Sequence, residues 1–188
     1  GILGPRNLSA RSARQDRARR DVVLPLSDAP ADERAVVDPV SQALQRYADR
    51  GVSRGFRAGP AARGRVDYQF NWLLRRPMHA VFDTRRRRLT FPNLFPGVSS
   101  RSAMARELAA LVRSRAGKEQ PAHKRLDTRL VRISGAVRKG EWSLTATIRG
   151  RSYDYAVRHA LNLINELFLA LHAGYPEYLV EHFGMSTE

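Results

Sequence analysis

The sequence predicts an α+β domain in which helices pack on one face of an antiparallel or mixed sheet. Apolar residues recur with a helical period near residues 40–47, 104–112 and 157–171, and they alternate with polar residues in between. The expected order is a helix, three strands, a second helix, a two-stranded hairpin and a third helix. At 188 residues the chain is long enough for one domain with a sizeable core, which we assign to residues 32–188.

Residues 1–31 form a separate compositional block. They contain six arginines and almost no apolar residue before Val22, so they should not fold alone. We expect a basic, flexible N-terminal arm. Such an arm either lies along phosphates or an acidic protein surface, or is a mobile tail without a partner.

The first helix is expected to begin at Asp38 and to end at Gly51. Asp38 is a suitable N-cap, and the fixed φ of Pro39 suits the first helical position. Glycine commonly follows the last helical turn. One side of this helix carries the apolar residues Val40, Ala43, Leu44 and Tyr47.

The three strands are expected over residues 52–57, 65–74 and 78–83. The second is the clearest, because Val66, Tyr68, Phe70, Trp72 and Leu74 alternate with polar residues. A turn at Arg75 and Arg76 leads to the third strand, and a charged turn over residues 84–88 follows it. Leu89 and Phe91 then continue the alternation until Pro92 ends it.

The segment FPNLFPGV, residues 91–98, reads as a proline-bounded loop with three large apolar residues. It is either packed against the core or an exposed contact surface, and core packing is favoured because exposed apolar clusters are costly. Ser99 or Ser100 then caps the second helix, which ends at Gly117. Its inward residues are Met104, Leu108, Leu111 and Val112.

The hairpin turns near Lys139 and Gly140 and leads to the third helix. This helix is apolar almost all round, which predicts burial, with Ile164 and Phe168 among the most buried residues. Ser152 is its expected cap, and Gly174 followed by Pro176 ends it. A further short helix over residues 176–183 should fold back onto the core.

The charge of the chain predicts an anionic partner. There are 33 Lys and Arg residues against 18 Asp and Glu, a formal net charge of +15. Net charge of this size bears on association with nucleic acid or acidic protein surfaces and not on the fold. The competing interpretation is a solvated surface that keeps the protein soluble.

Catalytic and cofactor motifs are absent from the sequence. The lack of cysteine excludes disulfides, thiolate zinc sites and thiol nucleophiles, and no glycine-rich phosphate loop or GxSxG is present. We therefore expect no metal, no cofactor and no enzymatic activity. His159 and Glu166 lie on one helical face, but seven residues separate them by about 10 Å of rise, too far to share one small ion.

The predicted polyanion-binding residues lie on the hairpin and at one strand turn. Arg132 and Arg138 alternate outward among hydroxyl residues on the first hairpin strand, and Arg149 ends the second. The turn contributes a run of four cations, Arg85, Arg86, Arg87 and Arg88. All large aromatic residues are expected in the core, so binding should follow the nucleic-acid backbone and discriminate poorly between sequences.

The alternative function is a protein-interaction or chaperone-like adaptor, possibly a homodimer, that uses residues 91–98, the last helix or a strand edge. The order of elements resembles that of the small chaperones of type III secretion, which implies a binding fold. Those chaperones are acidic dimers, and the charge of this chain departs from that pattern. No apolar run reaches the length of a membrane helix, so we expect a cytoplasmic protein without a membrane partner.

Overall fold

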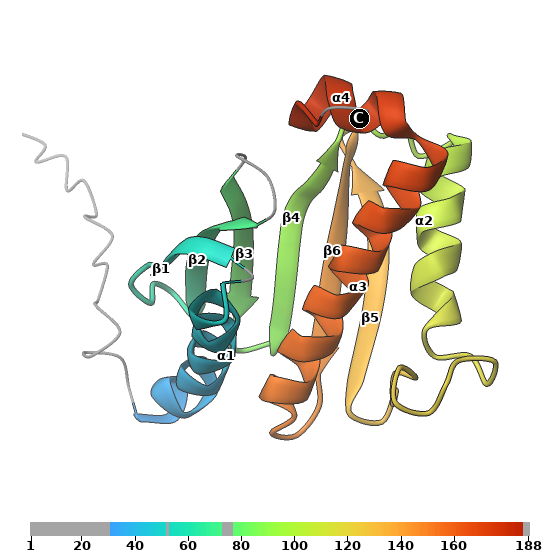
Figure 1. Cartoon of the computed structure of the whole chain (residues 1–188). Coiled ribbons are helices and arrows are strands. Elements are labelled where there is room, and N and C mark those ends of the chain that lie inside the picture. The colour runs from blue at the N-terminus through green and yellow to red at the C-terminus, as the bar shows by residue number, and fades with distance from the viewer. Residues whose placement is uncertain (1–30, 52, 73–76, 186–188) are drawn as a thin grey trace, which may run out of the picture.

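The computed structural model describes residues 31–51, 53–72 and 77–185, which build four helices and a six-stranded sheet (Figure 1). The elements in chain order are α1 (Ala31–Asp49), β1 (Ser53–Ala58), β2 (Arg65–Trp72), β3 (Pro77–Asp83), β4 (Arg88–Pro96), α2 (Ala103–Ser114), β5 (Val131–Arg138), β6 (Glu141–Ile148), α3 (Tyr153–Gly174) and α4 (Pro176–Phe183). Residues 1–30 of the expected arm and the expected turn at Arg75 and Arg76 lie outside the described residues.

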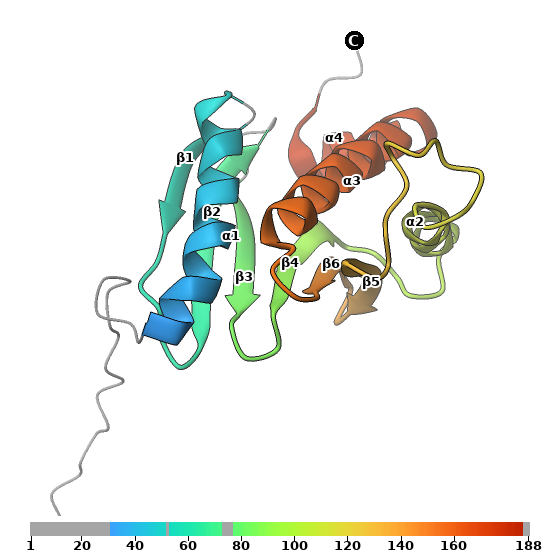
Figure 2. The same ribbon diagram turned by 90° about the horizontal axis from the view of Figure 1, so that it is seen from below.

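The sheet has the order β1-β2-β3-β4-β6-β5, and every neighbouring pair is antiparallel. Figure 2 shows α1 and α3 side by side over one face of this sheet. Helix α2 packs against β5 and α3 at one edge, and α4 lies across one end of the strands (Figure 1). The predicted α+β class is therefore confirmed, with an antiparallel sheet.

The expected count of three strands before the second helix is wrong, because β4 is a fourth full strand. Pro92 does not end it. Pairing with β6 is regular up to Phe91 and resumes at Phe95, and the ladder is irregular between them. A proline placed in such an irregular stretch gives up no ladder hydrogen bond. Asn93 has a φ of 49°, which marks the same local departure from the strand.

The expected start of the first helix at Asp38 is also wrong. Helix α1 begins at Ala31 and contains Pro39 in its interior. Val37 and Val40 are both fully buried, so the apolar stripe runs without interruption past the proline. This burial favours a helix that continues through Pro39, although proline removes one backbone hydrogen bond.

Helix α2 begins later and ends earlier than the serine and glycine signals suggest. Ser102, not Ser99 or Ser100, is its N-cap, and the Ser102 hydroxyl accepts a hydrogen bond from the Ala105 amide at 3.1 Å. At the other end, Arg115 and not Gly117 is the C-cap. The cap itself is the physical reason for the start, because it satisfies an amide that the helix leaves without a partner.

The core lies between the sheet and helices α1 and α3. Trp142, Tyr68, Phe82, Phe91 and Phe95 are its largest fully buried side chains. The large apolar residues of the segment 91–98 therefore pack into the core, as the sequence analysis favours. The expected loop is wrong, because most of the segment belongs to β4. No helix in the described part of the chain is both long and apolar enough to cross a membrane.

The buried face of α3 agrees with the sequence interpretation. Ile164 is fully buried and Phe168 is only 9% exposed. The ring of Phe168 meets Phe95 edge-on at 5.1 Å and Phe183 at 5.4 Å between centroids. Phe168 thus joins the sheet, α3 and α4 in one aromatic cluster.

Replacing Phe168 by alanine should lower the free energy of unfolding by about 3 to 5 kcal/mol, because the change removes buried surface and leaves a cavity. Chemical denaturation followed by circular dichroism measures this. Leu169→Ala is the matched control, since Leu169 is 61% exposed and its loss should change stability by less than about 0.5 kcal/mol. Equal effects of the two substitutions would contradict this description of the core.

Candidate functional site

The face of the sheet opposite α1 and α3 carries the polar residues of the alternating strands. We call it the open face, because no helix in the described ranges covers it. On β2, for example, Val66 and Tyr68 are fully buried under the helices, whereas Arg65, Asp67 and Gln69 are exposed. The same alternation holds on β6, where Thr145 and Thr147 lie between buried neighbours.

Strand register brings three arginines into one row on this face. Arg65 pairs with Asp83, which pairs with Arg88 across β2, β3 and β4. Arg88 pairs in turn with Thr147, which pairs with Arg132 across β6 and β5. Neighbouring strands are about 4.8 Å apart, so Arg88 and Arg132 start about 10 Å from each other on either side of Thr147.

On β4, β6 and β5 the next row on the same face consists of hydroxyl residues, and on β3 and β2 it continues to Val81 and Asp67. Thr90 pairs with Thr145, and Thr145 pairs with Ser134. The hydroxyls of Thr90 and Thr145 are hydrogen-bonded at 3.2 Å. The half of the open face formed by β4, β6 and β5 therefore combines arginine and hydroxyl donors, and its acidic residue, Glu141, lies at the far end of β6.

The structure separates the seven arginines predicted from the sequence. Arg88 and Arg132 share the open face, and Arg85, Arg86 and Arg149 lie at the same end of the sheet, at the β3–β4 turn or just past β6. Two do not join them. Arg87 donates a hydrogen bond to the Gly150 carbonyl at 3.0 Å and borders a hollow of about 610 Å³ beside α1 and α3, on the helix side. Arg138 lies at the opposite end of β5, where it pairs with Glu141.

Arg65 is not among the polyanion-binding residues predicted from the sequence. The alternation along β2 predicts its outward direction, but its place in the row with Arg88 depends on the register of three strands. Local periodicity within one strand carries no information on its register with the neighbouring strands.

Two carboxylates at this end of the sheet are already paired. Asp83 accepts hydrogen bonds from the backbone amide of Arg86 at 2.8 Å and from its guanidinium, and the first of these bonds is the main reason why its pKa is lowered. The side chain of Arg129 likewise lowers the pKa of Asp127 to about 2. Within the described residues, Arg65, Arg88 and Arg132 form no ion pair.

Phe, Tyr and Trp do not contribute to the open face in the described parts of β2 to β6. Those with described side chains on these strands are buried on the helix side: Tyr68, Phe70, Phe82, Phe91, Phe95 and Trp142. This agrees with the expectation that the face offers no platform on which bases can stack.

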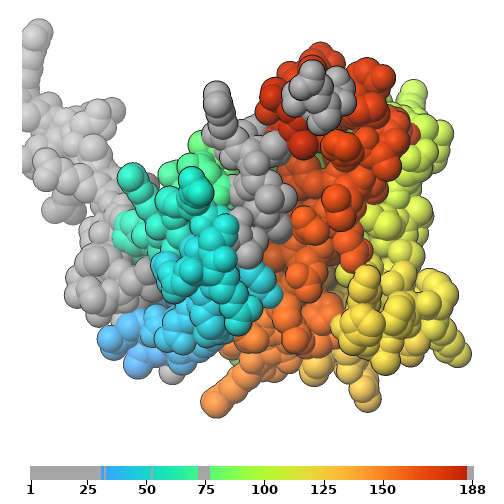
Figure 3. All heavy atoms as spheres, in the orientation of Figure 1, coloured from blue at the N-terminus to red at the C-terminus, as the bar shows by residue number. Residues whose placement is uncertain are grey.

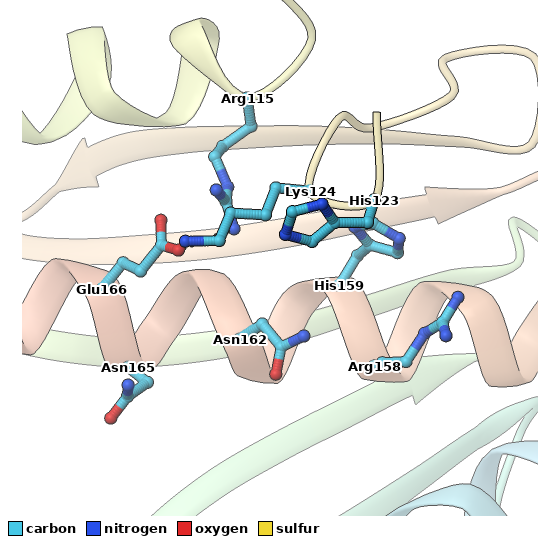
Figure 4. Close-up of a pocket in the computed structure, with 8 residues that line it drawn as sticks. All are labelled: Arg115, His123, Lys124, Arg158, His159, Asn162, Asn165 and Glu166. Carbon is cyan, nitrogen blue, oxygen red and sulfur yellow. Dashed lines mark ion pairs between the residues drawn. The ribbon is translucent and has the colours of Figure 1, made fainter. Parts of the chain in front are cut away.

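A second polar feature, which we call the α3 pocket, lies on the helix side. It has a volume of about 290 Å³, and polar residues of α3, of the C-terminal end of α2 and of the following connection line it (Figure 4). In Figure 3 the yellow connection between α2 and β5 lies against the orange part of α3. The pocket is therefore separate from the open face.

The α3 pocket contains both His159 and Glu166, the pair that the sequence places two helical turns apart. They do not act together directly. The buried guanidinium of Arg115 forms an ion pair with Glu166 at 2.9 Å, and the side chain of Arg115 is only 7% exposed. No group of three or more metal-ligating residues is present in the described ranges.

His159 is buried between charged neighbours and an aromatic ring. Its imidazole lies 4.1 Å from the Tyr155 ring, centroid to centroid, and the residue is 7% exposed. Burial lowers its pKa to about 4, and the positive charges of Arg158 and Arg115 act in the same direction. At neutral pH His159 is therefore an uncharged imidazole.

Comparison with protein-family models, with curated proteins and with solved structures gives no match for this chain. The open face and the α3 pocket are therefore the features from which a function can be inferred.

The lowered pKa of His159 predicts a pH dependence of stability. Between pH 6.5 and about 4 the unfolded chain binds a proton at His159 that the folded chain does not, so stability should fall by up to about 3 kcal/mol as the pH decreases through this window. His159→Gln should remove this part of the dependence, measured by denaturation at several pH values. His172→Gln, at an exposed position of α3, is the control. Identical pH profiles for His159→Gln and the unmodified chain would contradict the assignment.

Proposed function

We propose that this protein is a non-enzymatic binding module that holds nucleic acid by its sugar–phosphate backbone, on the open face of the sheet. The observation that carries the proposal is the row Arg88–Thr147–Arg132 beside the hydroxyls of Thr90 and Thr145. Guanidinium and hydroxyl groups are the side-chain donors that most often contact phosphate oxygens.

The charge balance supports the same proposal. The chain carries a formal charge of +15, and the nearest carboxylate in the row, that of Asp83, is hydrogen-bonded to Arg86. Arg88 and Arg132 thus have no carboxylate partner in the described residues and remain available to an external anion. Screening limits their attraction to a range of about 8 Å at physiological salt, so contact with phosphates must be close.

The absence of Phe, Tyr and Trp from the described open face determines the expected mode of binding. Proteins that bind single strands tightly normally stack bases on aromatic rings, and sequence-specific recognition needs hydrogen bonds to base edges. Arginine and hydroxyl donors can reach base edges, but without stacking rings to hold the bases in place we expect them to contact mainly the backbone. We expect salt-sensitive binding with little preference between sequences.

One observation that suggested the alternative role, a protein-interaction adaptor, does not hold in the structure, because the segment over residues 91–98 is not an exposed contact surface. Phe91, Leu94 and Phe95, the apolar residues that suggested a contact surface, are at most 5% exposed. What favours this alternative is an exposed apolar pair near the end of the chain, Leu169 on α3 and Val180 on α4. An acidic partner protein would still be attracted to the arginine row.

Two arginines on the same strand offer a matched test of backbone binding. In the full chain, Arg132→Ala should reduce the slope of log affinity against log salt by about 0.9 for duplex DNA and about 0.7 for single strands, because one phosphate contact is lost. Arg138→Ala should change the slope less, since Glu141 faces Arg138 across the ladder. Fluorescence anisotropy with random-sequence DNA and RNA between about 50 and 200 mM salt measures both.

Three outcomes would contradict the proposal. The protein could fail to bind either nucleic acid even at the low-salt end, the two substitutions could have equal effects, or one base sequence could be strongly preferred. Failure to bind would leave the adaptor role, to be tested by solution mass with Leu169→Glu. Equal changes of the salt slope in Arg132→Ala and Arg138→Ala would show that all exposed arginines attract nucleic acid to a similar degree, without a defined site.

A further inference from the structure

The α3 pocket has a lining that is unusual for a cavity of its size. Every residue that borders it has a polar or charged side chain, two of them histidines, and carbon atoms of these side chains also form part of its wall. Sites for drug-like or cofactor molecules are mostly apolar, with a few polar groups that fix orientation. The lining therefore favours a small, strongly polar ligand.

The charges in the pocket favour an anion. Arg115, Lys124 and Arg158 carry three positive charges, and Glu166 carries one negative charge. His159 adds none at neutral pH, because its buried imidazole is uncharged. The excess of two positive charges matches a phosphate monoester, which carries a charge of about −1.5 to −2 at pH 7.

Arg115 is held rigidly in place for such a contact. It is the C-cap residue of α2, and its carbonyl accepts a hydrogen bond from the Leu126 amide at 2.8 Å. Its buried guanidinium needs a negative partner, which Glu166 supplies in this structure. Because Glu166 is about 30% exposed at its side chain, an incoming anion can replace it at the guanidinium while Glu166 turns to solvent.

The connection that brings Lys124 to the pocket is held by hydrogen bonds within itself and to α3. The Lys124 and Arg125 amides both donate to the Pro121 carbonyl at 2.9 Å, and the Asp127 amide donates to the Tyr155 hydroxyl at 2.8 Å. In Figure 4 the side chain of Lys124 extends toward Glu166. The main chain of Lys124 is thus held beside the pocket by hydrogen bonds that do not depend on a ligand.

Neutral donors complete the lining. Asn162 and Asn165 come from the same helix as His159 and border the pocket together with it. Amide N–H groups and an imidazole N–H donate to phosphate oxygens, and the fork of a guanidinium matches two oxygens at once. The net positive charge of the pocket, its hydrogen-bond donors and the fixed position of Arg115 therefore all favour a ligand that carries a phosphate group.

We propose that the α3 pocket binds the phosphate group of a small molecule, with Arg115, Lys124 and Arg158 as the cationic contacts. The volume of about 290 Å³ lies at the lower end of the range for ligand pockets, so it suits a phosphate with a short organic group and not a dinucleotide. This site is independent of the open face, since it lies on the helix side of the sheet.

Two lysines of one connection provide the test. The full chain is titrated with inorganic phosphate and, separately, with glycerol 3-phosphate, and the side-chain amide signals of Asn162 and Asn165 are followed by NMR. Both signals should shift and saturate at millimolar ligand. Lys124→Ala should weaken binding about tenfold, the effect of losing one charge-assisted hydrogen bond. Lys118→Ala, at an exposed position outside the pocket, should leave affinity unchanged.

Glu166→Gln adds a test of opposite sign. It removes the carboxylate that competes for Arg115, so phosphate should bind several-fold more tightly. Tighter binding of glycerol 3-phosphate than of inorganic phosphate would identify a phosphorylated metabolite as the ligand class, and the reverse would identify free phosphate. The proposal is overturned if neither probe saturates the amide shifts, if Lys118→Ala weakens binding as much as Lys124→Ala, or if Glu166→Gln weakens it.

Discussion

The short junction between β3 and β4 is the constraint on which the rest of the structure depends. In the described part of the chain it is the one ladder that joins β1-β2-β3 to β4-β6-β5, through Val81 with Thr90, Phe82 with Leu89 and Asp83 with Arg88. Phe82 and Leu89 are fully buried, and burial of side chains of this kind contributes about 1.5 to 3 kcal/mol each. Packing of α1 against α3 bridges the same two halves, with an ion pair between Arg46 and Asp154.

The junction also determines where charge lies. Because Phe82 and Leu89 point into the core, their neighbours Asp83 and Arg88 must point to the open face, and the register extends the row to Thr147 and beyond. Helices α1 and α3 cover one face of the sheet, and the other face presents arginine and hydroxyl side chains. The α3 pocket then forms on the helix side, where Arg115 at the end of α2 meets Glu166 of α3. The two polar sites are thus products of one layered architecture.

Local periodicity in the sequence predicts the α+β class, the buried face of α3 and the outward direction of Arg132. It fails where contacts distant in the chain decide. Burial of Val37 extends α1 past the expected start at Asp38, and the irregular β4–β6 ladder accepts Pro92. Arg138 looks equivalent to Arg132 until register places Glu141 opposite it. Gly135 does lie on the hairpin, and the reason for glycine there is also a contact between strands, because a side chain would collide with the Trp142 ring. Arg115 pairs with Glu166 and contributes to the lowered pKa of His159, and the sequence gives no reason to select it.

The central claim is that nucleic acid contacts one face of the sheet. Methyl NMR tests this by comparing the two faces of one β-strand. Thr145 and Thr147 of β6 place their methyl groups on the open face, and Leu144 and Ile148 of the same strand place theirs under the helices. Titration of the full chain with random-sequence RNA should shift the two threonine methyls strongly and leave the leucine and isoleucine methyls nearly unchanged. Shifts of equal size in both pairs, or shifts confined to methyls of α1 and α3, would contradict the account.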